Sequence, residues 1–184
     1  VLLSNRLRWQ GPALWQGSLA KQKRQGVLRQ QRIAELLEQI DRAAAQAGIA
    51  LVALKGSALL SLGIYGPGER PMGDVDLLVR SEDVEATGRS LTTLGYAAEL
   101  RTWRHQTFVP GSASTRVRLG EHVDNPILIE VHTRILERLP ALDTEITAQV
   151  FPRAAQAGAN PYPSSAALMR HLLLHAAGNM RARA

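Results

Sequence analysis

The most informative segment of the chain reads Arg70-Pro-Met-Gly-Asp-Val-Asp-Leu-Leu-Val79. Side chains alternate between the two faces of a β-strand, so Asp74 and Asp76 would share one face of a strand over 74–79. The opposite face would point into a core through Val75, Leu77 and Val79. Two adjacent carboxylates repel each other unless a cation lies between them, and Mg²⁺ prefers oxygen ligands that it shares with phosphates. The pair therefore predicts a metal site for phosphoryl chemistry, with an exposed acidic turn as the alternative.

A strand-to-helix turn precedes this segment. An apolar run over 49–54 is followed by Lys55-Gly56-Ser57, a short helical pattern over 58–64 and a Gly/Pro-rich loop over 65–73. Glycine allows a ligand to approach the backbone closely, and the free N–H groups that begin a helix attract phosphate. The Ser57 hydroxyl would add a donor. Glycine and serine are also common at such turns for structural reasons, so both interpretations stay open.

A third acid lies within another strand pattern. Glu130 falls in Ile127-Leu-Ile-Glu-Val-His132. It is either an outward-facing residue of a half-exposed sheet or a third metal ligand. His132 would lie on the same strand face as Glu130. There it could join the site or form structural hydrogen bonds at the end of the sheet. His171 and His175 have i, i+4 spacing on a predicted helix, and helix packing is the favoured interpretation because no third ligand is evident.

The remaining patterns complete an α/β (α+β) fold. Helical periodicity covers 26–47, which Gly48 ends, and 81–94, with Ser81 as N-cap and Gly95 at the end. Further strands are predicted over 96–100, 102–109 and 115–119. Helical patterns follow over 139–150 and 164–180. This order predicts one mixed β-sheet with helices packed against it.

Length and composition fit one domain with helical extensions. The chain has 184 residues, of which 45% are apolar and 21% charged, as is usual for a globular protein. We expect a basic helical arm over 1–27, a core over 28–135 and a helical C-terminal region over 136–184. The absence of cysteine excludes disulfides and thiolate metal sites. Without a long apolar run or a signal-peptide pattern, we expect a soluble, cytoplasmic protein.

The net charge of +6 is concentrated near the N-terminus. Residues 1–34 contain seven Lys/Arg and no acid, whereas the other 150 residues contain 15 Lys/Arg and 16 acids. The seven are Arg6, Arg8, Lys21, Lys23, Arg24, Arg29 and Arg32. A basic arm can bind nucleic acid or an acidic partner, but a solvated helical face is favoured because no interleaved aromatic residues are present to stack on bases. Val1 is not a natural start and the last helix has no stop signal, so we expect truncation at both ends.

Together, the Gly-Ser turn, the Asp-x-Asp strand and the later acid resemble the nucleotidyltransferase fold of the DNA polymerase beta-like superfamily. More narrowly, the chain from about Leu28 to Ala177 resembles a bacterial family of largely uncharacterised nucleotidyltransferases. The motifs are Leu54-Lys-Gly-Ser-Ala-Leu-Leu60, Arg70-Pro-Met-Gly-Asp-Val-Asp-Leu-Leu-Val79, Leu94-Gly-Tyr96, Ile129-Glu-Val-His132 and His171-Leu-Leu-Leu-His-Ala-Ala177. The 16 residues between Ser57 and Asp74 exceed the spacing in most of the superfamily, so the nucleotide pocket is less well defined by the resemblance.

The resemblance implies transfer of a nucleoside monophosphate from an NTP such as ATP to an acceptor hydroxyl, with release of pyrophosphate. Asp74 and Asp76 would hold Mg²⁺, or Mn²⁺, in a two-metal arrangement. Glu130 would complete the acceptor-side metal or act as general base.

The same resemblance assigns the phosphates to the turn. Gly56 and Ser57 would bind the terminal phosphates, and Lys55 or Arg70 would neutralise them or, alternatively, would pair structurally with the acids.

The nucleotide, the acceptor (a small molecule or a macromolecule) and the oligomeric state stay open. One different class is a non-catalytic module that binds a nucleotide or a partner, of a regulatory or toxin–antitoxin type; three mutually repelling acids argue against it. Another is a nucleic-acid-binding protein that depends on residues 1–34, which predicts salt-dependent binding without a metal.

Overall fold

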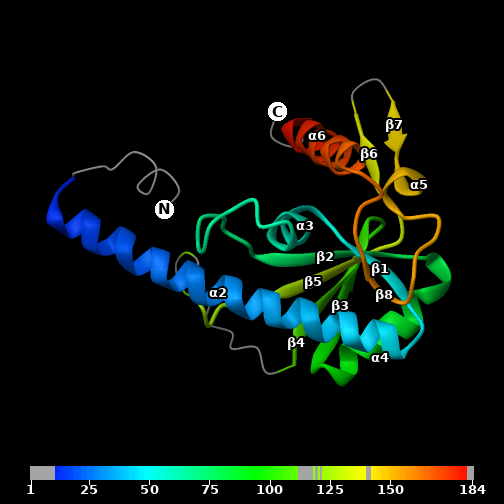
Figure 1. Cartoon of the computed structure of the whole chain (residues 1–184), viewed down its shortest axis with the longest axis horizontal. Helices are drawn as coiled ribbons and strands as arrows, with labels where there is room; N and C mark the ends of the chain where they lie inside the picture. Colours follow the sequence, from blue (N-terminus) through cyan, green and yellow to red (C-terminus); the bar gives the residue numbers. More distant parts are fainter. Residues whose placement is uncertain (1–10, 112–117, 119, 121, 140–141, 182–184) are drawn as a thin grey trace.

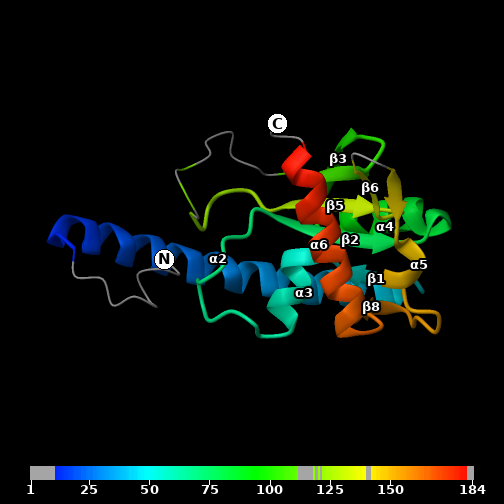
Figure 2. The same cartoon turned by 90° about the horizontal axis from the view of Figure 1, so that it is seen from above.

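A mixed six-stranded sheet with helices on both faces forms the body of the protein (Figure 1). The computed structural model describes residues 11–111, 118, 120, 122–139 and 142–181. Across the sheet the strands are β3 (Tyr96–Arg101), β4 (His105–Pro110), β5 (Leu128–His132), β2 (Asp74–Val79), β1 (Ala50–Ala53) and β8 (Gly158–Asn160). One face is covered by α2 (Ala13–Gln46) and α4 (Val84–Thr93), and the other by α3 (Lys55–Ser61) and α6 (Ser165–Arg181) (Figures 1 and 2). The predicted fold class is confirmed.

Side-chain alternation divides the core between the two faces of the sheet. Val75, Leu77 and Val79 of β2 are buried in the cluster beneath α2, as predicted. Leu78 points the other way and packs with Val52 of β1 and with residues of α6. The central strand β2 is therefore buried on both faces, and the carboxylates at its start mark the point where this apolar environment ends.

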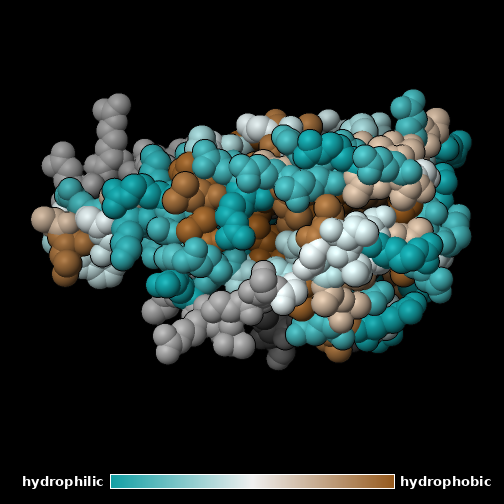
Figure 3. Space-filling model, turned by 90° about the horizontal axis from the view of Figure 1, so that it is seen from below, coloured by the Kyte–Doolittle hydropathy of each residue, from teal (hydrophilic) through white to brown (hydrophobic). Residues whose placement is uncertain are grey.

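The helix α2 is longer than the pattern over 26–47 indicated. It begins at Ala13 and runs without a break for 34 residues, about 51 Å. Its C-terminal part packs on the sheet, and Gly48 follows in a left-handed conformation (φ 72°), as predicted. Its N-terminal part projects beyond the sheet, where Leu14 and Trp15 are 81% and 62% exposed, and Figure 3 shows hydrophobic side chains at this end.

Arg29 corrects the interpretation of the basic arm as a solvated face. It is buried on the inner side of α2, whereas Lys21, Lys23 and Arg24 are exposed. Its guanidinium donates hydrogen bonds to the backbone carbonyls of residues 72 and 73 before β2 and of residues 125 and 126 before β5, at 2.7–3.1 Å. This one side chain thus ties α2 to the entrances of the two strands that carry the acids.

The segments around the predicted helices differ in detail from the patterns. The helix α3 begins at Lys55 rather than at residue 58. Ser81 is not an N-cap, because it begins a 3₁₀ turn, η1 (Ser81–Asp83), and α4 starts only at Val84 without a side-chain cap. The predicted strand over 115–119 lies mostly outside the described residues.

The C-terminal region is less helical than expected. The predicted helix over 139–150 is wrong: β6 (Leu136–Arg138) and β7 (Asp143–Glu145) form a hairpin, and only α5 (Thr147–Val150) is helical. The apolar side chains of Leu139, Ile146 and Val150 have helical spacing but belong to different elements that share one core. The strand β8 was not predicted; it pairs with β1 and joins this region to the sheet, and α6 follows close to the predicted 164–180.

Within the described residues, no helix is both long enough and apolar enough to cross a membrane.

Candidate active site

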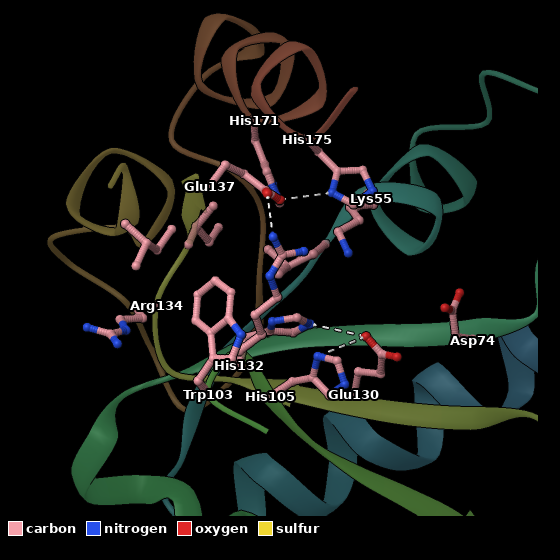
Figure 4. A pocket seen from close by; sticks show the side chains of 14 residues that line it. Lys55, Asp74, Trp103, His105, Glu130, His132, Arg134, Glu137, His171 and His175 are labelled. Atoms are coloured by element: carbon pink, nitrogen blue, oxygen red, sulfur yellow. Dashed lines mark hydrogen bonds and ion pairs between the residues drawn. The ribbon is translucent and has the colours of Figure 1, made fainter. Parts of the chain in front are cut away.

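Strand register gathers polar side chains on one face of three neighbouring strands. β2 and β5 are parallel with Asp76 opposite Glu130, and β4 and β5 are antiparallel with His105 opposite His132. Asp74 lies two residues before Asp76 and therefore shares its face. Above this face is a cavity of about 220 Å³, and Asp74, His105, Glu130 and His132 line it (Figure 4).

Asp76 is the anchored member of the predicted pair. It is 5% exposed, and its Oδ1 accepts a hydrogen bond from Lys55 Nζ at 2.8 Å and lies 3.0 Å from His132 Nε2. Burial opposes ionisation, but the bonds from His132 and the Lys55 ammonium outweigh it and hold the pKa of Asp76 well below its usual range. Asp76 is thus an ionised carboxylate held in one orientation, and Lys55 lies beside the acids as the sequence suggested.

Asp74 has a different environment from its neighbour. It is the exposed first residue of β2, and Figure 4 shows no hydrogen bond or ion pair between it and the other residues drawn. Partial burial of its carboxyl group, followed by the charges of Asp76 and Glu130, raises the pKa of Asp74. The repulsion that the sequence predicted is therefore present at Asp74, where an added cation would relieve it.

Glu130 lies between two imidazoles. Its Oε2 is 3.4 Å from His105 Nδ1 and 3.6 Å from His132 Nε2. The ligand atoms of these three residues lie within 4.8 Å of one another, which makes them a group that could hold a metal ion. Sequence analysis included Glu130 and His132 but missed His105, because its place opposite His132 depends on strand pairing rather than on local sequence.

The turn from β1 to α3 brings a further set of donors near Asp76. Lys55 has a φ of 48°, a conformation that costs a non-glycine residue of order 1 kcal/mol and occurs often at functional sites. Arg70 packs over Gly56, where a Cβ atom would lie 3.4 Å from the guanidinium, an ordinary van der Waals contact. Ser57 Oγ and Arg70 Nε are buried, and neither has a hydrogen-bond partner in the part of the chain that the structure describes. Lys55 lines the cavity, whereas Gly56, Ser57 and Arg70 are not among its lining residues.

A second group of polar side chains lines the opposite side of the cavity. Glu137 of β6 accepts a hydrogen bond from Arg104 at 3.1 Å and lies 3.2 Å from His175 Nδ1 (Figure 4). His171 is buried, and burial followed by the charges of Lys55 and His175 lowers its pKa to about 4. His171 is therefore neutral at neutral pH, and its Nδ1 shares a hydrogen bond of 2.7 Å with the Tyr162 hydroxyl. Both helical histidines line the cavity, where His171 is bonded to Tyr162 and His175 to Glu137.

Comparison with known proteins identified a matching family model and a similar solved structure. A family model described as "Uncharacterised nucleotidyltransferase" matches residues 2–183. We found no match among the curated proteins. Among solved structures, the crystal structure of the Cid1 poly(U) polymerase matches with a TM-score of 0.33 and 18% identity. That match covers 56% of this chain and 30% of the polymerase chain, so the protein spans less than a third of that structure.

Proposed function

Because the chain belongs to this family of uncharacterised nucleotidyltransferases, we propose that it moves a nucleoside monophosphate from a nucleoside triphosphate to an acceptor hydroxyl and releases pyrophosphate. The observation that carries this proposal is the set of three carboxylates, Asp74, Asp76 and Glu130, on one face of adjacent strands. Asp74 and Glu130 line the cavity, and Asp76 is buried beside them. Nothing in the site selects a base or a particular acceptor, so the proposal covers a class of reaction.

The donor set fits a divalent ion such as Mg²⁺ or Mn²⁺. Asp74 and Asp76 present carboxylate oxygens from the same strand face, and Glu130 adds another from the neighbouring strand. Such ligands suit hard cations. When bound, the ion supplies positive charge that neutralises the triphosphate and lowers the pKa of the acceptor hydroxyl. Asp76 is already ionised and oriented, whereas Asp74 would lose its raised pKa as the cation binds.

The turn after β1 supplies the proposed phosphate contacts. Lys55 places an ammonium between the cavity and Asp76, where it can balance either the acid or a phosphate. Ser57 Oγ and Arg70 Nε, which have no hydrogen-bond partner among the described residues, are donors that a phosphate oxygen would satisfy after a small movement of the turn. Arginine suits this role because its fork of donors matches a phosphate group.

Glu130 and His132 lie where an acceptor would have to be activated. Glu130 borders the cavity and contacts only imidazoles among its ion-pair partners in the described residues, so it is available to bind a metal ion or to accept a proton. The hydrogen bond of His132 to Asp76 and the nearby Glu130 carboxylate outweigh burial and raise the pKa of His132, so His132 can offset the repulsion between the two acids in the free protein.

Labelled nucleotides test the reaction class. Each of the four NTPs, labelled separately at the α- and γ-phosphates, is incubated with Mg²⁺ or Mn²⁺ and a cell extract as the source of acceptor. Nucleotidyl transfer places the α label on an acceptor and the γ label in pyrophosphate, and Asp74→Asn/Asp76→Asn abolishes both signals. Transfer of the γ label alone would contradict the proposal, because it would show phosphoryl rather than nucleotidyl transfer.

A further inference from the structure

The imidazoles beside Glu130 give this part of the site a different metal chemistry from that of the aspartates. We infer that His105, Glu130 and His132 form a binding site for a transition-metal ion of the Zn²⁺ or Co²⁺ type. This inference adds a second metal site to the proposed function. It rests on that function only through Glu130, which would be a ligand both in this site and in the aspartate site. The aspartates, which offer only carboxylate oxygens, would not select this type of metal ion.

The spacing of the ligand atoms fits such an ion. In a tetrahedral site with bonds of about 2.0–2.1 Å, neighbouring ligand atoms are about 3.3–3.4 Å apart. The observed distances to Glu130 Oε2 are 3.4 Å from His105 Nδ1 and 3.6 Å from His132 Nε2. An octahedral Mg²⁺ with bonds of similar length needs neighbours only about 2.9 Å apart and takes oxygen rather than nitrogen ligands. The ligand type and the two spacings that involve Glu130 therefore favour the transition metal, and all three ligand atoms lie within 4.8 Å of one another.

The three side chains are held by a rigid support. His105 and His132 face each other across the pairing of β4 with β5, and Glu130 is two residues from His132 on the same strand face. Paired strands fix the backbone, so metal binding requires only small side-chain rotations. Asp76 is held by Lys55, and a metal ion at His132 Nε2 would replace the present hydrogen bond of that atom to Asp76. This leaves three protein ligands and a fourth position that opens on the cavity. Three ligands with one open position are typical of zinc sites that bind substrate or water.

The other histidine–carboxylate group in the cavity, around Glu137, is not open to a metal ion in this way. Glu137 also contacts a histidine, His175, but it is bonded to the permanent cation of Arg104 as well. A metal ion there would have to displace a guanidinium, whereas at Glu130 it would displace imidazole protons and the His132–Asp76 hydrogen bond but no permanent cation. The group around Glu137 therefore provides a control within the same molecule.

Titration of the nucleotide-free protein with Co²⁺ tests the inference, because the visible absorption of Co²⁺ strengthens when the ion passes from its octahedral aqua complex to a tetrahedral protein site. The wild type should bind one Co²⁺ that Zn²⁺ displaces. His105→Gln should weaken Co²⁺ binding about 100-fold. This equals the largest loss of affinity that is typical when a residue behind a metal ligand is removed. His175→Gln and Asp74→Asn should bind as the wild type does. His105 is only half-buried, so its variant is expected to fold, which circular dichroism checks.

Two results would overturn the inference. One is no Co²⁺ binding by the folded wild type, and the other is binding that Asp74→Asn removes and His105→Gln leaves intact. The same proteins are then mixed with Mg²⁺ and each NTP, with thermal stability as the readout. Failure of Co²⁺ binding with intact Mg²⁺-dependent NTP binding refutes only the transition-metal site. Intact Co²⁺ binding without any response to nucleotides refutes only the nucleotidyltransferase proposal.

Discussion

Glu130 and Glu137 face one cavity from opposite sides, and each contacts histidine, but their surroundings differ. Glu130 lies on the central sheet and contacts only imidazoles among its ion-pair partners in the described part of the chain. Glu137 lies on the β6–β7 hairpin and is bonded to Arg104 and His175, which attach β6 to the neighbouring elements. A carboxylate whose partners can lose their charge is available for a ligand, whereas one with a permanent cation is available mainly for structure. We therefore expect Glu130 to matter for turnover and Glu137 for stability.

The largest expected effect is on the reaction rate of Glu130→Gln. The amide cannot accept a proton or bind a divalent ion as a carboxylate does, so kcat should fall by about 10²–10⁴-fold while NTP binding and thermal stability change little. Steady-state kinetics with the acceptor found in the labelling experiment measures kcat. The matched variant Glu137→Gln should retain most of the rate. Equal rate losses in both variants would remove the distinction between the two acids.

The next largest effect concerns the stability of the fold at acid pH, which depends on His171 on the Glu137 side of the cavity. His171 has its pKa lowered to about 4 by burial, so the unfolded state binds a proton below pH 6.5 that the folded state refuses until about pH 4. The free energy of unfolding should therefore fall by up to about 3 kcal/mol as the pH decreases from 6.5 to 4. Urea unfolding at several pH values measures this slope. His171→Gln should have a shallower slope, and an unchanged slope would show that His171 is not the group that titrates.

A smaller loss is expected from Glu137→Gln. The change removes the charge that pairs with Arg104 and His175, and breaking a fully buried pair costs about 3–5 kcal/mol. Arg104 remains partly exposed to solvent, so we expect the free energy of unfolding to decrease by about 2 kcal/mol. Urea unfolding at neutral pH provides the value, with Glu130→Gln as the control that should lose much less. The reverse order of stabilities would contradict the comparison.

The smallest effect tests how closely α6 approaches Glu137. A Cβ atom at Gly178 would overlap the Glu137 carboxylate. Gly178→Ala should therefore destabilise the protein by about 1 kcal/mol, because the displaced carboxylate costs more than the alanine gains in helix propensity. Gly17 in the projecting part of α2 has no atom near its Cβ position, so Gly17→Ala should instead stabilise by up to about 1 kcal/mol. Thermal unfolding distinguishes the two, and stabilisation by both variants would show that Glu137 moves without cost.

Sequence patterns predicted the acidic side of the cavity better than the opposite side. The alternation over 74–79 and 127–132 placed Asp74, Asp76 and Glu130 on strands that the structure contains, because alternation is a local property. His105 escaped detection because strand pairing, not local sequence, brings it to Glu130. The hairpin of β6, which carries Glu137, and β7 was not predicted. Residues 139–150 were assigned to a helix instead, because Leu139, Ile146 and Val150 have helical spacing although they belong to separate elements.

Arg29 illustrates the same limit for charge. The count of charged residues assigned Arg29 to a basic arm, and its neighbours in the sequence did not distinguish it from Lys21 or Arg24. Its burial depends on carbonyl groups more than 40 residues away, which bond all three of its guanidinium nitrogens. Side chains that acquire their partners through tertiary contacts are therefore the ones that sequence patterns misjudge.

The central claim is that the carboxylates on β2 bind a metal–nucleotide complex. The most direct test is the thermal stability of wild type, Asp74→Asn and Glu137→Gln with each NTP, in the presence and absence of Mg²⁺ or Mn²⁺. A nucleotide at 100 times its Kd should stabilise the wild type by about 2.7 kcal/mol. We predict a metal-dependent shift in wild type and in Glu137→Gln that Asp74→Asn loses. A shift of equal size in Asp74→Asn, or no shift in any of the three proteins, would contradict the claim.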